Sequence, residues 1–158
     1  GLVIDLRDNP GGNLDTVCDI LDLILPEGTI VSTKDKNGEG ETYTSDEEHK
    51  LEIPLSVLTN GNSASASEIF AGAVQDYGVG TLVGTTTFGK GIVQQIFPLT
   101  DGTSIKLTIS EYFTPKGRNI HGTGIDPDVE VEYEYNEEDP AADNQLEKAI
   151  EIVKGNGM

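Results

Sequence analysis

One stripe of apolar residues, bounded by glycine turns, constrains the fold of this chain more than any other feature. The stripe recurs at helical spacing through Ala66, Ile69, Phe70, Ala73, Val74 and Tyr77. The turn Asn60-Gly61-Asn62 precedes it, and Gly78 and Gly80 follow it. The pattern therefore predicts a helix over 66–77 with one apolar face, which other elements must cover.

Apolar runs elsewhere in the chain predict strands. Two runs that end at polar or glycine turns, 2–7 and 53–59, are expected to be buried strands, and two further runs, 81–83 and 92–97, are expected to be strands. The alternation of side chains predicts further β structure: a hairpin of 29–34 with 41–44, a strand over 104–112 and an acidic edge strand over 129–135. Helical spacing predicts two more helices, over 14–25 and over 144–154, with Asp143 as the N-cap of the second. Together these elements indicate an α/β protein with a mixed β-sheet and flanking helices.

The charge of the chain limits its partners. It carries 28 Asp and Glu against 10 Lys and Arg, a formal net charge of −18. No basic patch can release counterions from phosphates, so nucleic-acid binding is excluded, and the same charge argues against anionic membranes. No run approaches the roughly 20 apolar residues that span a bilayer.

Cys18 is the only cysteine in the sequence, so no intrachain disulfide can form. Its apolar neighbours predict a buried, unreactive thiol.

Ser65 stands at the start of the predicted helix and has two interpretations. The segment Ser65-Ala66-Ser67-Glu68 matches the capping box S-x-x-E, in which the serine only caps the helix and contributes about 1 kcal/mol. Alternatively Ser65 is a nucleophile, because a side chain at a helix N-terminus lies beside free N–H groups and the positive end of the helix dipole. The N–H of Ala66 would then bind an oxyanion, and the Gly11-Gly12 turn would supply a second donor.

Lys90 also has two interpretations. The segment Gly84 to Lys90 matches the first seven positions of the phosphate-binding loop G-x-x-x-x-G-K-[ST]. Gly91 stands where that loop needs a hydroxyl, and an apolar strand follows where it needs a helix, so no nucleotide is expected. A lysine can instead act as a general base where burial lowers its pKa toward 7, and Phe88 and the following strand are expected to supply that burial. Gln94 is placed to orient the amine.

No metal or other cofactor is expected. Asp126, Asp128 and Glu130 alternate, but Val131 stands where a calcium loop needs glycine. The two histidines, His49 and His121, are expected at the surface, so no aspartate–histidine pair competes with Lys90 as the base.

Several segments, in this order, resemble the carboxyl-terminal processing proteases, also called tail-specific proteases. They are Ile4–Gly12 (IDLRDNPGG), Asn60–Ile69 (NGNSASASEI), Thr87–Gln94 (TFGKGIVQ), Tyr112–Pro115 (YFTP) and Gly124–Pro127 (GIDP). The resemblance implies a cofactor-free serine endopeptidase that cleaves near the C-termini of proteins. It assigns Ser65 as the nucleophile, Lys90 as the base and Gln94 as the partner that orients the base.

The same resemblance implies roles for other residues and a type of fold. Gly11 or Gly12 would form the oxyanion hole with Ala66, and Glu68 and Thr87 match positions near the site. Asp76 matches a further polar position, and it reads equally well as a residue at the C-terminal end of the helix. The implied fold is the crotonase-like core of the ClpP/crotonase type.

The expected domain organisation is a peptidase core over 1–135 and an acidic linker with a C-terminal helix over 136–158. The resemblance also predicts a PDZ domain upstream, which these residues do not include. Because Gly1 lies inside a strand pattern and is not a Met, an N-terminal part with any targeting signal is expected to be missing.

The expected partners are protein or peptide substrates bound by their C-terminal region, in an extracytoplasmic location, with homo-oligomerisation left open. The alternative is a non-catalytic scaffold of the same fold that binds peptides along a sheet edge.

Overall fold

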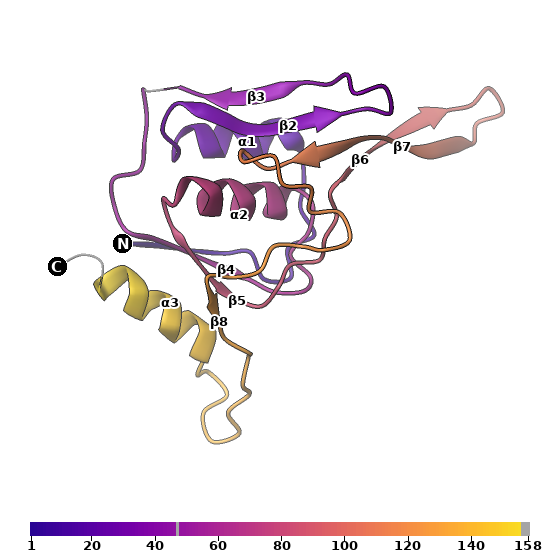
Figure 1. The fold of residues 1–158 in the computed structure, drawn as a ribbon. Coiled ribbons are helices and arrows are strands. Elements are labelled where there is room, and N and C mark those ends of the chain that lie inside the picture. The colour runs from indigo at the N-terminus through magenta and orange to yellow at the C-terminus, as the bar shows by residue number, and fades with distance from the viewer. Residues whose placement is uncertain (47, 156–158) are drawn as a thin grey trace.

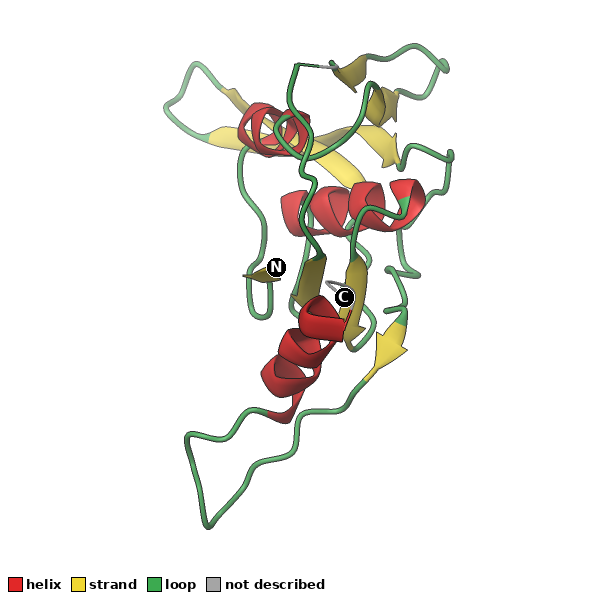
Figure 2. Cartoon of the chain, turned by 90° about the vertical axis from the view of Figure 1, so that its left-hand side faces the viewer, coloured by secondary structure: helices red, strands yellow, loops and turns green. Residues whose placement is uncertain are grey.

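The computed structural model of the protein describes residues 1–46 and 48–155. Helix α2 (Ala66–Tyr77) lies between two four-stranded sheets, with α1 (Leu14–Asp22) beside it, as Figures 1 and 2 show. A further helix, α3 (Asn144–Gly155), packs on the opposite face of one sheet. The layers therefore run sheet, helices, sheet, helix. The predicted α/β class is confirmed, and its parallel and antiparallel strands belong to two separate sheets.

The parallel sheet has the strand order β1 (Leu2–Asp5), β4 (Leu55–Thr59), β5 (Thr81–Gly84) and β8 (Val129–Glu130). All five residues of β4 are buried, as expected for a parallel strand that is covered on both faces. Parallel strands point their carboxyl ends to one edge of the sheet. The loops after β1, β4 and β5 therefore emerge side by side, where α/β proteins commonly place their ligands.

The antiparallel sheet has the strand order β3 (Thr42–Ser45), β2 (Gly28–Lys34), β7 (Ser104–Phe113) and β6 (Ile92–Pro98). The predicted β2–β3 hairpin is confirmed. Strands β6 and β7 form a second hairpin that projects from the body of the molecule (Figure 1). Sheet and helices share a core in which Leu21, Leu25 and Leu82 are fully buried, each worth about 1.5–3 kcal/mol relative to exposure.

Cys18 lies in this core, as expected, with 7% of its surface exposed. Burial, and then the charges of Asp15 and Asp19, raise the pKa of its thiol to about 11. Cys18 is therefore protonated and unreactive at neutral pH. His49 and His121 are exposed, as predicted.

The predicted edge strand over 129–135 is too long, because β8 contains only Val129 and Glu130. Side chains at the start of α3 form hydrogen bonds with backbone carbonyl groups that a neighbouring strand would otherwise bind. Gln145 donates to the Val131 carbonyl at 2.6 Å, and Asn144 donates to the Glu132 carbonyl at 2.7 Å. The alternation of apolar and polar residues over 129–135 could not predict these hydrogen bonds, because their donors lie on a distant helix.

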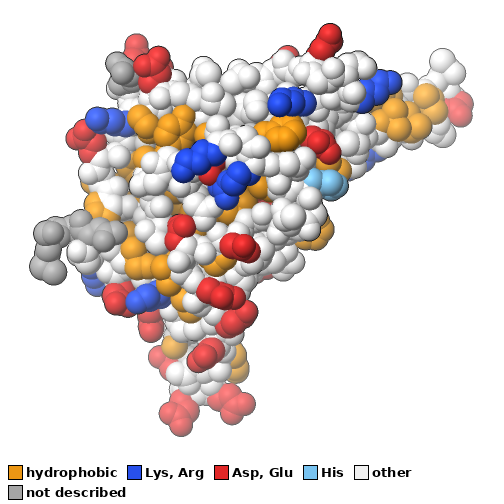
Figure 3. Space-filling view, viewed as in Figure 1, with side chains coloured by type: hydrophobic (Ala, Val, Ile, Leu, Met, Phe, Trp, Pro, Cys, Tyr) orange, Lys and Arg blue, Asp and Glu red, His pale blue; other side chains and the backbone are white. Residues whose placement is uncertain are grey.

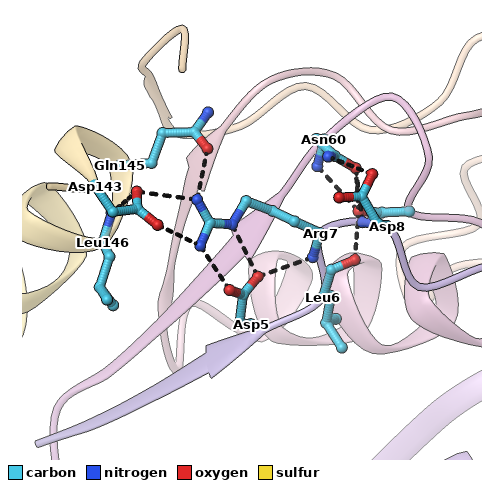
Figure 4. Close-up of polar contacts among 9 residues, drawn as sticks. Asp5, Leu6, Arg7, Asp8, Asn60, Asp143, Gln145 and Leu146 are labelled. Atoms are coloured by element: carbon cyan, nitrogen blue, oxygen red, sulfur yellow. Dashed lines mark hydrogen bonds and ion pairs between the residues drawn. The ribbon is translucent and has the colours of Figure 1, made fainter. Parts of the chain in front are cut away.

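Arg7 joins the end of β1 to the start of α3 (Figure 4). Its guanidinium bonds Asp5 at 2.7 Å, Asp143 at 2.7 Å and Gln145 at 3.0 Å. Asp143 also accepts the Leu146 N–H at 2.9 Å, so the predicted N-cap is confirmed. The hydrogen bond from Arg7 holds the pKa of the Asp143 carboxyl below its usual range.

Charge and apolar surface are unevenly distributed (Figure 3). Asp and Glu gather at the end of the molecule where β8 leads into α3, whereas the β6–β7 arm exposes apolar side chains that include Ile96 and Leu107. In the described part of the chain, no helix has the length and hydrophobicity that a bilayer crossing requires.

Candidate active site

The three segments singled out in the sequence meet at the carboxyl edge of the parallel sheet. The Gly11-Gly12 turn follows β1, Ser65 follows β4 and Lys90 follows β5. Since β4 lies between β1 and β5 in the sheet, the serine segment lies between the glycine turn and the lysine segment. Order along the chain and order in the sheet together bring distant residues into one site.

Ser65 has an unusual backbone conformation at the N-terminus of α2, with φ 58° and ψ −117°. Non-glycine residues in such regions carry strain of about 1–3 kcal/mol and concentrate at functional sites. The capping box predicted for this segment is present. The Glu68 carboxylate accepts the Ser65 N–H at 2.9 Å, while the Glu68 N–H donates to the Ser65 carbonyl at 2.8 Å. Residues 65–68 thus have the arrangement of a capping box, but the Ser65 hydroxyl makes no side-chain capping hydrogen bond.

Glu68 joins the serine segment to the lysine segment. Its side chain is fully buried, and Oε2 accepts the N–H of Ser65 at 2.9 Å and the N–H of Lys90 at 2.8 Å. Oε1 accepts the Thr87 hydroxyl at 2.6 Å and the Gly89 N–H at 2.7 Å. A buried carboxylate is tolerated only with such partners, and here each partner belongs to the site.

Thr87 extends this network to a fourth segment. Its buried hydroxyl donates to Glu68 and accepts the Ile125 N–H at 2.8 Å. The Thr87 N–H in turn donates to the Ile125 carbonyl at 3.1 Å. Thr87 therefore fixes the lysine segment against the chain around Gly124. The two segments are so close that a Cβ on Gly124 would lie 2.3 Å from the Thr87 carbonyl oxygen.

The glycine turn passes directly over Ser65. A Cβ on Gly11 would lie 2.5 Å from the Ala64 carbonyl oxygen and 2.8 Å from the Ala66 nitrogen, and its φ of 96° also favours glycine. The Gly11 N–H donates to the Asn9 side chain at 2.9 Å. Within the described residues, no acceptor lies at hydrogen-bonding distance from the N–H of Gly12 or of Ala66.

Asp8 holds the start of this turn against the start of the serine segment. Its carboxylate accepts a side-chain N–H of Asn60 at 3.1 Å, and its own N–H donates to the Asn60 side chain at 3.0 Å (Figure 4). The carboxylate also accepts a side-chain N–H of Asn62 at 2.7 Å. The hydrogen bonds from Asn62 and Asn60 lower the pKa of the Asp8 carboxyl. The carboxylate therefore stays ionised and keeps both bonds at neutral pH.

A single pocket of about 340 Å³ is lined by residues from all three segments, including Gly12, Ser65, Ala66, Lys90 and Gln94. Gln94 reaches it through an irregularity in the β6–β7 pairing between Val93 and Gln94. Side chains of a regular strand alternate between faces, yet Ile92, Val93 and Gln94 all line the pocket. The structure thus brings the predicted nucleophile, base and orienting residue together.

Other predicted features lie differently. Lys90 is half-buried, but Phe88 is 64% exposed and does not enclose it. Asp76 lies near the opposite end of α2, where it pairs with Arg118 at 2.5 Å and accepts the Lys116 N–H at 2.8 Å. The loop from Gly84 to Lys90 leads into a strand, as expected, which leaves no helix N-terminus for a phosphate.

Tyr112 is a site residue that the sequence did not reveal. It is the next-to-last residue of β7, is 2% exposed and lines the pocket that contains Ser65 and Lys90. The YFTP segment was the only signal, and it carried no assigned role. Burial, reinforced by the charge of Glu68, raises the pKa of the Tyr112 phenol far above its usual value, so the hydroxyl remains a donor.

A second pocket of about 470 Å³ adjoins the first and shares Gly12, Asn13 and Ala66 with it. Its other walls are mostly apolar and come from β1, the residue after it, α1 and α2, including Ile4, Leu6, Val17, Ile20 and Phe70. An apolar side chain next to a carbonyl in the first pocket would therefore find an apolar recess beside the glycine turn.

Comparison with known proteins gives the same family from sequence and from structure. The chain is 46% identical over 158 residues to a carboxyl-terminal-processing protease of Synechocystis, covering 98% of this chain and 37% of that protein. It is 45% identical over 132 residues to the carboxy-terminal processing protease CtpB of Bacillus subtilis, covering 83% and 28%. A solved photosystem II D1 C-terminal processing protease superposes with a TM-score of 0.78 at 37% identity, covering 84% and 34%.

The chain thus spans about a third of the length of these relatives. The model of peptidase family S41 matches residues 1–131, which is most of the chain and includes all three site segments. The chain therefore belongs to peptidase family S41.

Proposed function

We propose that this chain supplies the catalytic centre of a serine endopeptidase that cleaves near the C-terminus of protein substrates. The observation that carries the proposal is the shared pocket of Ser65, Lys90 and Gln94, lined also by the backbone of Gly12 and Ala66. The proposed roles are Ser65 as nucleophile, Lys90 as base and Gln94 as the residue that orients the amine.

In the proposed mechanism, Ser65 Oγ attacks the substrate carbonyl carbon while its proton passes to the neutral amine of Lys90. The resulting oxyanion accepts hydrogen bonds from the N–H of Gly12 and the N–H of Ala66. We favour Gly12 over Gly11 because the Gly11 N–H already donates to Asn9. The C–N bond then breaks, and the leaving amine takes the proton from Lys90.

A water molecule completes the reaction. Lys90 takes one proton from the water as its oxygen attacks the acyl-enzyme carbonyl. The ester bond to Ser65 breaks, and the proton returns to Ser65 Oγ. The products are a new carboxyl end on the substrate and a free serine, so no cofactor takes part in the balance.

The apolar pocket beside Gly12 supports a preference for apolar side chains at the bond that is cut. We further propose that substrates are proteins held by their C-terminal region and that the protein works outside the cytoplasm, as the family resemblance implies. Cell fractionation with antibodies against the chain tests the location.

The test compares wild type, Ser65→Ala and Lys90→Ala, each in the polypeptide in which the chain naturally occurs. The substrate is a peptide with an apolar C-terminus, and circular dichroism checks the fold. Loss of cleavage in both folded variants supports the mechanism. Wild-type cleavage by both would show that Ser65 and Lys90 have structural roles only. If wild type does not cleave the peptide, labelling of Ser65 by a fluorophosphonate decides whether the site is competent.

A further inference from the structure

The N–H groups and the carbonyl groups of Ser65 and Lys90 are held by two different side chains. Glu68 Oε2 accepts both N–H groups. On the carbonyl side, the Tyr112 hydroxyl lies 3.2 Å from the Ser65 carbonyl oxygen and also contacts the carbonyl oxygen of Lys90. Two side chains therefore bridge the same pair of backbone segments, one through a carboxylate and the other through a hydroxyl.

We infer that Tyr112 is a positioning residue for peptide hydrolysis, whose hydroxyl keeps the backbones of Ser65 and Lys90 at a fixed separation. The inference rests on the proposed function. Tyr112 acts through the two catalytic residues and needs no contact with substrate.

The two carbonyl groups depend on the hydroxyl to different degrees. The Ser65 carbonyl also accepts the N–H groups of Glu68 at 2.8 Å and Ile69 at 3.0 Å. Within the described residues, Tyr112 is the only donor to the Lys90 carbonyl. Without the hydroxyl, that carbonyl loses its donor and faces a second carbonyl dipole, so the lysine segment is expected to move away from the serine.

The position of Tyr112 is set by the sheet and does not depend on substrate. Its backbone N–H donates to the Gly91 carbonyl at 3.1 Å, and its neighbour Glu111 pairs with Ile92 in the β6–β7 register. The ring packs in the core with 2% exposure. The hydroxyl is therefore held beside Lys90 in the free protein, as preorganisation of a site requires.

The test variant is Tyr112→Phe, which removes one oxygen and keeps the ring. Its matched control is Tyr77→Phe, because the Tyr77 hydroxyl also donates to a backbone carbonyl, that of Thr29, at 2.9 Å. Tyr77 is the last residue of α2, and Ser65 comes just before the first. At a rise of 1.5 Å per helical residue, the backbones of the two residues are about 18 Å apart along the helix. Steady-state cleavage gives kcat and KM, and a fluorophosphonate gives the rate at which Ser65 is labelled.

The inference expects Tyr112→Phe to lower kcat by about 100-fold, the scale of a 1 Å misplacement, with KM within twofold of wild type. Labelling of Ser65 should slow in parallel, and Tyr77→Phe should keep the wild-type kcat. A folded Tyr112→Phe enzyme with kcat within twofold of wild type overturns the inference. An equal loss in both variants overturns it too, because the effect would then be general.

Two further variants separate the remaining outcomes. Ser65→Ala tests the proposed function alone: if it cleaves like wild type, the mechanism fails whatever Tyr112 does. If Tyr112→Phe does not fold, 4-aminophenylalanine at position 112 replaces it, since that residue keeps the ring and an N–H donor. The inference then requires kcat within tenfold of wild type, and a folded but inactive protein overturns it.

Discussion

Replacing Glu68 by Gln tests the central contact of the site, because it changes one oxygen to an NH2 group and leaves the volume almost unchanged. All four hydrogen bonds to the carboxylate, from Ser65, Thr87, Gly89 and Lys90, are donated to it. If the amide nitrogen takes the place of Oε2, it faces two N–H donors. If it takes the place of Oε1, it faces the Gly89 N–H and the Thr87 hydroxyl.

At least one buried donor is therefore left without an acceptor in either orientation, and the other hydrogen bonds lose their charged acceptor. Hydrogen bonds to a charged group contribute about 1.5–3 kcal/mol each, and an unpaired buried donor costs about 1–3 kcal/mol. We expect Glu68→Gln to lower the free energy of unfolding by about 3–5 kcal/mol, as the sum of one unpaired buried donor and the weakening of the remaining hydrogen bonds.

Chemical denaturation followed by circular dichroism measures this loss, and fluorophosphonate labelling of Ser65 measures what remains of the site. The control is Glu41→Gln, because Glu41 is exposed and its carboxylate accepts only the Tyr43 hydroxyl, at 3.0 Å, among side-chain donors of the described residues. The control should stay within about 0.5 kcal/mol of wild type. A Glu68→Gln protein that loses less than 1 kcal/mol and is labelled at the wild-type rate would refute the reasoning.

Three further changes have defined outcomes. Gly11→Ala should lose at least about 1–2 kcal/mol of stability and most labelling of Ser65, because the residue has a φ of 96° and its new Cβ would lie 2.5 Å from the Ala64 carbonyl oxygen. The control Gly12→Ala should fold normally, because its Cβ would meet no atom within 4 Å. Equal melting temperatures for the two variants would contradict this expectation. Ser65→Gly should be more stable than Ser65→Ala by about 1 kcal/mol in urea unfolding, since glycine accepts φ 58° without strain, and the reverse order would show that the backbone is unstrained.

Asp143→Asn keeps a capping side chain but removes the charge paired with Arg7. Because the folded pKa of Asp143 is lowered, the stability it adds is present above the unfolded pKa of about 3.9 and disappears as pH falls through the folded value. The difference between wild type and variant should shrink on acidification, and a constant difference in urea unfolding from pH 7 to pH 3 would argue against the ion pair.

Periodicity and turn residues were enough to predict the helices and most strands, because local pattern decides these elements. The helix over 66–77 has the predicted bounds. The strand over 129–135 was overestimated, because Gln145 and Asn144 pair with its backbone from a distant helix. Likewise the division into two sheets could not be predicted, because alternation within one strand carries no information about which strand lies beside it. The pairing of β2 with β7 is an example.

For the site, the sequence identified residues whose chemistry is visible in their type and spacing. Ser65 and Lys90 were predicted in this way, and the structure brings them to one pocket, although their catalytic roles stay predictions. The contribution of Tyr112 was not visible, since it consists of one hydroxyl meeting two backbone carbonyls. Nor could spacing choose between Gly11 and Gly12, a choice that depends on the Asn9 side chain.

Under the proposed function, the bridge through Tyr112 has a consequence for when a growing chain can become active during translation. Ser65 and Glu68 leave the ribosome first, Lys90 follows 25 residues after Ser65, and Tyr112 follows 22 residues after Lys90. At about 5–20 residues per second, Ser65 leaves the ribosome seconds before the strand that carries Tyr112 is made. Peptidase activity would then arise only late in synthesis, and a nascent chain would be unable to cut itself or its neighbours on the polysome.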